Sequence, residues 1–191
     1  MNNSSNIVLF GTSRFAVIVF EQLLQNGFVP AVLVTQPDRP QGRNLVCTPP
    51  PAKIWAAEHN IQILQPEELD DAFQKTIQNE SYQLAIVASY GTIIPKDILA
   101  IFPYGILNVH PSLLPKFRGP SPALSAILAD ERSTGVTIME MNEKMDAGPV
   151  VAQAKIELEE GGHGSPEGGW PPKGSLFEDL LATEGGNLLA E

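Results

Sequence analysis

Asn6 to Thr35 reads NIVLFGTSRFAVIVFEQLLQNGFVPAVLVT, and this segment sets the architecture of the chain. Its first apolar run ends at Gly11-Thr12-Ser13, so it predicts a strand that leads into a helix with Thr12 or Ser13 as N-cap. The helix is predicted over residues 14–25, Asn26-Gly27 ends it, and a second strand follows over residues 29–35. A strand, helix and strand in this order imply two parallel strands joined by a right-handed crossover.

The same alternation continues along the chain, and it predicts an α/β fold in one domain over residues 1–191. Helices are expected over residues 52–59, 66–79, 120–129 and 175–189, and strands over residues 61–64, 84–88, 105–109, 135–141 and 149–158. The last two strands form an expected antiparallel pair. The turn at Gly11 lacks the later glycines of G-x-G-x-x-G, which disfavours dinucleotide binding.

Composition limits the class of protein. The 191 residues are 43% hydrophobic and 18% charged, with a net charge of −10 that argues against broad nucleic-acid binding but permits a local basic contact. No apolar run approaches the roughly 20 residues that span a bilayer, and the first residues do not resemble a signal peptide. A single cysteine, Cys47, fits a reducing compartment. We therefore expect a cytoplasmic protein with no membrane contact.

The segment 36–51 is a long proline-rich loop. It holds five prolines, which predict the absence of regular structure, and Arg39 and Arg43 are its charged groups besides Asp38. A loop of this length inside a compact domain is usually functional or disordered. From pattern alone, a solvated surface loop is the favoured interpretation.

Asn108 and His110 follow an apolar run and are predicted at the exit of a strand. Residues two apart on an extended backbone point to the same side, so an amide donor and an imidazole would project together. Asp146 lies in a predicted turn, residues 142–148. Each of the three could be an ordinary turn or structural residue, but together they suit direct acyl transfer. Asn108 and a protonated His110 would stabilise an oxyanion while Asp146 holds the imidazole charged, and no metal is required.

The segment from Ser89 to Pro95 follows a probable central strand. Its backbone amides lie beside apolar side chains, and such a wall can hold a flat heterocycle. An ordinary strand-to-helix loop would look the same in the sequence. There is no P-loop, no paired-cysteine or clustered-histidine metal site and no nucleophile elbow to compete with the three polar residues.

Several separated motifs resemble the 10-formyltetrahydrofolate-dependent formyltransferases. Asn108-Val-His110, Ser112-Leu-Leu-Pro115 and Arg118-Gly119 resemble that family as a whole. Other motifs are similar to the branch that acts on initiator methionyl-tRNA: Phe10-Gly11-Thr12, Thr35-Gln-Pro-Asp-Arg-Pro40 with Gly42-Arg43, and Gly135-Val-Thr-Ile138. The resemblance runs from about residue 7 to 160 and resumes over 170–189.

The resemblance implies a Rossmann-like, mostly parallel sheet with helices on both faces. It implies that Asn108, His110 and Asp146 are catalytic, with 10-formyltetrahydrofolate as formyl donor and no metal. Apart from the resemblance, we expect the chain to be a monomer. Folate would lie along Ser89, Tyr90, Gly91, Thr92, Ile93 and Ile94, near Ser112, Leu113, Leu114 and Pro115, and near the turn before Asp146. The loop 36–51 would reach the acceptor end of initiator methionyl-tRNA, with Arg39 and Arg43 as contacts, which replaces the solvated-loop interpretation.

The chain departs from the family pattern in four places. The family carries a C-terminal barrel-like domain that helps hold the tRNA, and this domain is expected to be absent from the given sequence. Gly161 to Gly169 looks like an insert. Asn44-Leu45-Val46 stands where lysine is expected, and Pro111 resembles the branch that formylates glycinamide ribonucleotide. Two alternatives therefore stay open: formyl transfer to a small amine, such as an amino sugar nucleotide or glycinamide ribonucleotide, or a domain that binds or hydrolyses folate and is inactive as a transferase.

Overall fold

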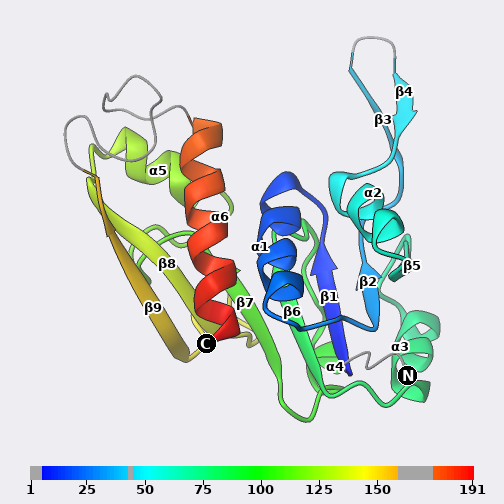
Figure 1. Ribbon diagram of the computed structural model, residues 1–191. Coiled ribbons are helices and arrows are strands. Elements are labelled where there is room, and N and C mark those ends of the chain that lie inside the picture. Colours follow the sequence, from blue (N-terminus) through cyan, green and yellow to red (C-terminus); the bar gives the residue numbers. More distant parts are fainter. Residues whose placement is uncertain (1–5, 43–44, 159–173) are drawn as a thin grey trace.

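A seven-stranded sheet forms the centre of the protein, whose computed structural model describes residues 6–42, 45–158 and 174–191 (Figure 1). The strand order is β5-β2-β1-β6-β7-β8-β9, in which the first five strands are parallel and β8 and β9 are antiparallel. The strands are β1 Ile7–Gly11, β2 Val32–Val34, β5 Gln62–Leu64, β6 Leu84–Ala88, β7 Ile106–His110, β8 Ser133–Glu140 and β9 Val150–Glu157. The mostly parallel α/β sheet and the antiparallel pair at its end are confirmed.

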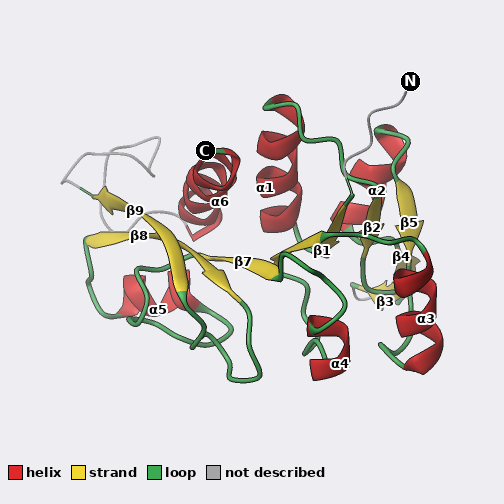
Figure 2. Cartoon of the chain, turned by 90° about the horizontal axis from the view of Figure 1, so that it is seen from below, coloured by secondary structure: helices red, strands yellow, loops and turns green. Residues whose placement is uncertain are grey.

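Helices cover both faces of this sheet, as the fold class predicts. They are α1 Arg14–Gln25, α2 Pro51–Glu58, α3 Asp71–Asn79, α4 Lys96–Leu99, α5 Pro122–Leu128 and α6 Gly174–Ala190. Figure 2 shows α1, α2 and α6 on one face and α3 and α4 on the other. None of the described helices is both long and apolar enough to cross a membrane.

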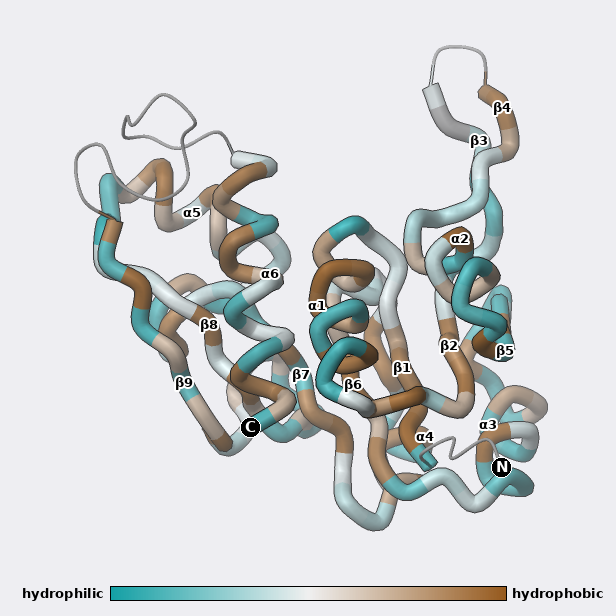
Figure 3. Tube along the Cα trace, viewed as in Figure 1, coloured by the Kyte–Doolittle hydropathy of each residue, from teal (hydrophilic) through white to brown (hydrophobic). Residues whose placement is uncertain are grey.

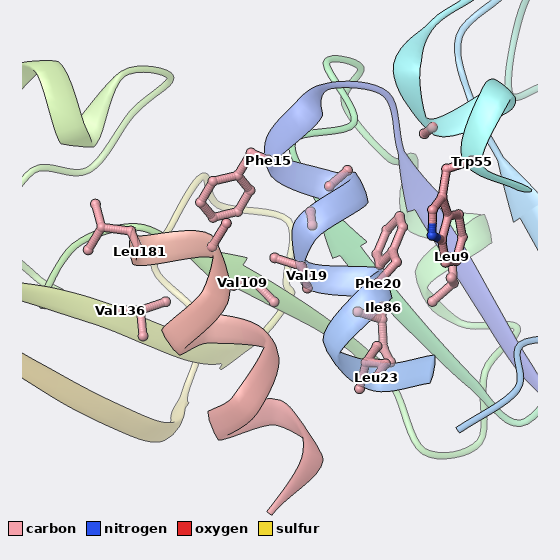
Figure 4. Packing of buried hydrophobic residues seen from close by; sticks show 14 of the residues in the cluster. Leu9, Phe15, Val19, Phe20, Leu23, Trp55, Ile86, Val109, Val136 and Leu181 are labelled. Atoms are coloured by element: carbon pink, nitrogen blue, oxygen red, sulfur yellow. The ribbon is translucent and has the colours of Figure 1, made fainter. Parts of the chain in front are cut away.

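Two apolar cores lie on the two faces, and successive residues of the central strands alternate between them. Leu9 belongs to the core under α1, α2 and α6, whereas its neighbours Val8 and Phe10 belong to the core under α3 and α4. The strands β1, β2 and β6 are mostly hydrophobic in Figure 3, because both of their faces are covered. Figure 4 shows the first core, where the rings of Phe20 and Trp55 pack with centroids 5.8 Å apart.

Two glycines let α6 approach the rest of this core closely. A Cβ at Gly185 would lie 2.6 Å from a methyl carbon of Val109, and one at Gly186 would lie 2.8 Å from the carbonyl oxygen of Val19. Only a residue without a side chain fits at such separations. The Gly-Gly pair thus brings α6 against both α1 and β7, the strand that carries the predicted site.

The prediction that residues 36–51 lack regular structure is wrong in part, because this segment contains an antiparallel hairpin. Its strands are β3 Arg39–Gln41 and β4 Val46–Thr48, and Pro40 pairs with Cys47. In a two-stranded ribbon both strands are edges, so the missing N–H of a proline need not remove a ladder hydrogen bond. The hairpin projects from the body of the protein at the top right of Figure 1.

Two helix predictions also differ from the structure. The third helix begins at Asp71 rather than at Pro66, because the Asp70 carboxylate caps it by accepting a hydrogen bond from the Phe73 N–H at 2.9 Å. Helix α4 was not predicted, since its four residues are too few to show a helical period. Arg43 and the insert Gly161 to Gly169 lie outside the described residues.

Candidate functional site

The predicted polar residues meet beside β7. Asn108 and His110 both lie in this strand, two residues apart as predicted, and His110 pairs with Thr137 of β8. The turn between β8 and β9 carries Asp146, whose carboxylate returns to the His110 ring. The structure therefore brings together His110 and Asp146, which are far apart in the sequence.

His110 is a buried imidazole with an acceptor on each side. Its residue is 4% exposed, its Nε2 lies 3.0 Å from the carbonyl oxygen of Phe117, and its Nδ1 lies 3.7 Å from Asp146 Oδ1. A carbonyl oxygen and a carboxylate can only accept hydrogen bonds. The contact of Nε2 with the Phe117 carbonyl oxygen therefore requires Nε2 to carry a proton and to donate it.

Asp146 has two different partners for its two oxygens. Oδ2 accepts a hydrogen bond from the Gly119 N–H at 2.8 Å, while the 3.7 Å between Oδ1 and His110 Nδ1 is an ion-pair distance too long for a hydrogen bond. The carboxylate is thus fixed in place by a backbone amide. Nδ1 of His110 therefore has no hydrogen-bond partner among the described residues.

Asn108 presents an amide that the protein leaves available. The residue is half-buried in β7, and among the described residues its side chain has no hydrogen-bond partner. An unengaged amide N–H can donate to a developing oxyanion. The catalytic role of Asn108 stays a prediction.

The segment after β7 is held by a small polar network that sequence reasoning missed. The Thr137 hydroxyl donates to the Ser112 carbonyl oxygen at 2.6 Å and accepts from the Leu114 N–H at 3.0 Å and from Gln153 Nε2 at 2.8 Å. Gln153 also donates to the Leu114 carbonyl oxygen at 3.0 Å. The segment that follows His110 is therefore fixed to β8 and β9. The signal in the sequence for this network was Thr137, a polar residue at an inward-facing position of β8.

The residues predicted to line a folate site divide into two groups. The side chains of Tyr90, Ile94, Ser112 and Leu114 are buried. Exposed or partly exposed are Ser89, Gly91, Thr92, Ile93, Leu113 and Pro115. The backbone N–H groups of residues 91–94 donate to no described residue, so a ligand with acceptor atoms fits that segment.

Hydrogen bonds tie the segment after β6 to the turn after β1. The Thr12 hydroxyl donates to the Tyr90 carbonyl oxygen at 2.8 Å, and Ser13 donates to the Ser89 hydroxyl at the same distance. Ser13 is the N-cap of α1, but its hydroxyl does not cap the helix. Burial raises the pKa of Tyr90 to about 12, so its hydroxyl stays protonated at neutral pH.

The proline-rich segment is anchored by charged and polar contacts. Lys53 pairs with Asp38 at 2.7 Å, and the hydrogen bonds from Gln65 and Lys53 lower the pKa of Asp38. Arg39, a predicted RNA contact, is exposed and pairs with Glu67 at 3.1 Å. This arginine is thus already partly neutralised. Among the described residues, no group of three or more His, Cys, Asp or Glu could hold a metal ion.

Comparison with protein families and curated proteins gives a consistent result. A model of the family described as formyl transferase matches residues 5–163. The methionyl-tRNA formyltransferase of Chloroflexus aurantiacus is 48% identical over 153 residues, which are 80% of this chain and 49% of that protein. That of Bacillus cytotoxicus is 42% identical over 187 residues, 97% of this chain and 56% of that protein. The chain thus spans about half the length of the curated relatives it matches.

Solved structures show the same fold at lower identity. Phosphoribosylglycinamide formyltransferase from Streptococcus pneumoniae has a TM-score of 0.74 at 18% identity, covering 96% of this chain and 94% of that one. Glycinamide ribonucleotide transformylase 1 from Symbiobacterium toebii has a TM-score of 0.73 at 19% identity, covering 100% and 86%. At these identities the likeness concerns the fold alone.

Proposed function

Because this chain belongs to the formyl transferase family, we propose that it transfers the formyl group of 10-formyltetrahydrofolate to the methionine amine of initiator methionyl-tRNA. The observation that carries this proposal is the approach of Asp146 Oδ1 to His110 Nδ1 at 3.7 Å, beside the available amide of Asn108. The choice of acceptor is supported by the 48% and 42% identity to methionyl-tRNA formyltransferases.

In the proposed reaction the amine nitrogen attacks the formyl carbon directly. A C–N bond forms to the amine, and the carbonyl oxygen becomes an oxyanion that accepts hydrogen bonds from Asn108 and from His110 Nδ1–H. The bond from the formyl carbon to N10 of the folate then breaks. The proton lost by the amine passes to N10 with Asp146 as the relay, so no net proton is released.

The proposed folate site is the segment after β6 together with the segment after β7. The unengaged backbone N–H groups of residues 91–94 would bind the acceptor atoms of the pterin, and Ile93 would contact its face. When bound, the folate supplies the activated formyl group. Ser112 and Leu114 would act through their backbone, because the Ser112 hydroxyl is engaged with the Lys116 carbonyl oxygen at 2.7 Å.

The acceptor would approach along the β3–β4 hairpin. Arg39 belongs to this hairpin, and Arg43 lies in the segment between its two strands. The exposed apolar residues Leu45 and Val46 give the hairpin a surface that suits apolar contact with unpaired bases rather than phosphate binding alone. For Arg39, contact with RNA would require exchange of its Glu67 partner.

The test is a turnover assay with the 191-residue chain. The chain is incubated with 10-formyltetrahydrofolate and either methionine-charged initiator tRNA, glycinamide ribonucleotide or no acceptor, and the release of tetrahydrofolate is followed. We expect release that depends on the charged tRNA and yields formylmethionyl-tRNA. Release of tetrahydrofolate without an acceptor would refute the transferase proposal. Release with glycinamide ribonucleotide but not with charged tRNA would show that the acceptor is glycinamide ribonucleotide.

A further inference from the structure

A row of polar side chains crosses the three neighbouring strands β7, β8 and β9 and begins at His110. His110 pairs with Thr137 of β8, and Thr137 pairs with Gln153 of β9. Residues in register on neighbouring strands point to the same face of a sheet. The preceding residues Val109 and Val136 face α6, so the three polar side chains lie on the opposite face. Gln153 is two strand spacings from His110, or about 10 Å.

Gln153 uses both hydrogens of its amide within this row. Its Nε2 donates to the Leu114 carbonyl oxygen at 3.0 Å and to the Thr137 hydroxyl at 2.8 Å. Because a carbonyl oxygen only accepts hydrogen bonds, the NH₂ group of the amide must face Leu114. The Thr137 side chain is fully buried and donates its own proton to the Ser112 carbonyl oxygen at 2.6 Å. Without Gln153, two oxygens of this network would each lose a donor.

The hydrogen bonds continue from Ser112 to the imidazole. The Ser112 hydroxyl donates to the Lys116 carbonyl oxygen at 2.7 Å, which closes this segment into a turn. The next residue, Phe117, places its carbonyl oxygen 3.0 Å from His110 Nε2. Among the described residues, this is the only hydrogen bond to the His110 ring, since Asp146 lies at 3.7 Å. The orientation of the ring therefore depends on where the turn holds the Phe117 carbonyl group.

We infer that Gln153 is a positioning residue for His110, acting through Thr137 and the turn that ends at Phe117; the effect expected on turnover rests on the proposed function. Each link between Gln153 and His110 is a hydrogen bond or a short stretch of shared backbone. Loss of the two donors of Gln153 frees the turn to move, and the Phe117 carbonyl group moves with it. A displacement of a catalytic group by about 1 Å can reduce turnover about 100-fold.

The test separates the donors of Gln153 from its bulk. Gln153→Met removes both donors at nearly the same side-chain length, whereas Gln153→Lys keeps donors in an ammonium group that accepts nothing. The matched control is Lys155→Met, two residues along the same face of β9, where the lysine is exposed and pairs with Glu157. For each variant kcat, KM for 10-formyltetrahydrofolate and the midpoint of thermal unfolding are measured.

We expect Gln153→Met to lower kcat about tenfold to 100-fold, well below its unfolding temperature and with a smaller change in KM. Gln153→Lys should recover most of this loss, and Lys155→Met should keep the native kcat. A variant Gln153→Met that is less stable but has native kcat would overturn the inference, because the contact would then be structural only. A rise in KM without a fall in kcat would also overturn it. If Gln153→Met does not fold, the same outcomes are read from Gln153→Glu, whose carboxylate cannot donate.

A measurement without turnover separates this inference from the proposed function. In NMR spectra, the Nε2–H of His110 should be protected from exchange with water by the Phe117 carbonyl oxygen, and its signal is identified by its loss in His110→Ala. We expect exchange about tenfold faster in Gln153→Met, but native exchange in Lys155→Met. If the unaltered chain formylates no tRNA, the proposed function fails, and this signal still decides the role of Gln153. Unchanged exchange in Gln153→Met would overturn the inference.

Discussion

Asp146 is expected to act both as a charge and as a tether, and substitution can separate the two roles. Asp146→Asn removes the charge that faces His110, but its amide oxygen can still accept the hydrogen bond from the Gly119 N–H. Asp146→Ala removes both contacts. We therefore expect similar losses of turnover in the two variants but different losses of stability.

The magnitudes follow from the two distances. Two unit charges 3.7 Å apart attract by about 4 kcal/mol at an effective dielectric constant of roughly 20, which limits the loss of kcat to about 1000-fold. A hydrogen bond to a charged acceptor contributes about 1.5–3 kcal/mol. The 2.8 Å bond from Gly119 should therefore make Asp146→Ala less stable than Asp146→Asn by about 1–2 kcal/mol.

Stability is measured by urea unfolding, turnover by tetrahydrofolate release, and folate affinity by equilibrium titration. We expect folate affinity to persist in both variants and in His110→Ala, because the proposed pterin contacts lie on residues 91–94. Near-normal turnover of Asp146→Asn would refute the role of its charge. Equal stability of the two variants would refute the tether, whatever happened to turnover.

Three further outcomes are expected. Burial raises the pKa of Tyr90 from 10.0 to about 12, so this tyrosine ionises at a lower pH in the unfolded chain than in the folded protein. The protein should therefore lose up to about 2.7 kcal/mol of stability as pH rises from about 10 to 12. In urea unfolding Tyr90→Phe should escape this loss, whereas Tyr104→Phe, at an exposed site, should still show it. The hydrogen bond from Trp55 is the main contact that lowers the pKa of Glu21 from 4.5. Its contribution to the stability of the fold is therefore present above about pH 4.5 and lost as pH falls through the pKa of the folded protein. The melting temperature of Glu21→Gln should fall less steeply with acid than that of the unaltered chain, and parallel curves would contradict this. A Cβ on Gly148 would lie 1.7 Å from the last carbonyl oxygen of β8, so Gly148→Ala should cost about 3 kcal/mol or more in thermal unfolding, and a variant as stable as the native chain would show that the turn can shift.

Periodicity predicted the layers of this fold because the signals are local. Both faces of β1 and β6 are covered by helices, so these strands are continuous hydrophobic segments that can be identified in the sequence. Asn108 and His110 were placed correctly because a two-residue spacing on a strand has one geometric meaning. The pairing of Asp146 with His110 was suggested by the chemistry of acyl transfer and then implied by the family resemblance, since no spacing rule links residues so far apart.

The features that escaped prediction depend on backbone groups or on tertiary context. The Phe117 carbonyl oxygen and the Gly119 N–H hold the ion pair, yet every residue except proline carries both groups, so no letter in the sequence marks them. The hairpin around Cys47 was hidden by prolines that an isolated ribbon accepts at its edges. Side-chain capping by Asp70 likewise outweighed the proline that suggested an earlier helix start.

The two segments that bracket His110 contain backbone conformations that cannot be favoured locally. Phe117 and Asp146 have φ angles of 53° and 47°, which are uncommon for residues with side chains and cost on the order of 1 kcal/mol each. Gly119, with φ of 108°, is at a position where only glycine is comfortable.

The contacts that offset this strain are made by the proposed catalytic pair itself. The Phe117 carbonyl oxygen faces His110 Nε2, and the Gly119 N–H binds Asp146 Oδ2. Each of these two contacts joins one segment to a side chain of the proposed catalytic pair, so the pair and its supporting backbone stabilise one another. This coupling places His110 and Asp146 in fixed positions before any substrate arrives, which is the condition under which an oxyanion site is effective.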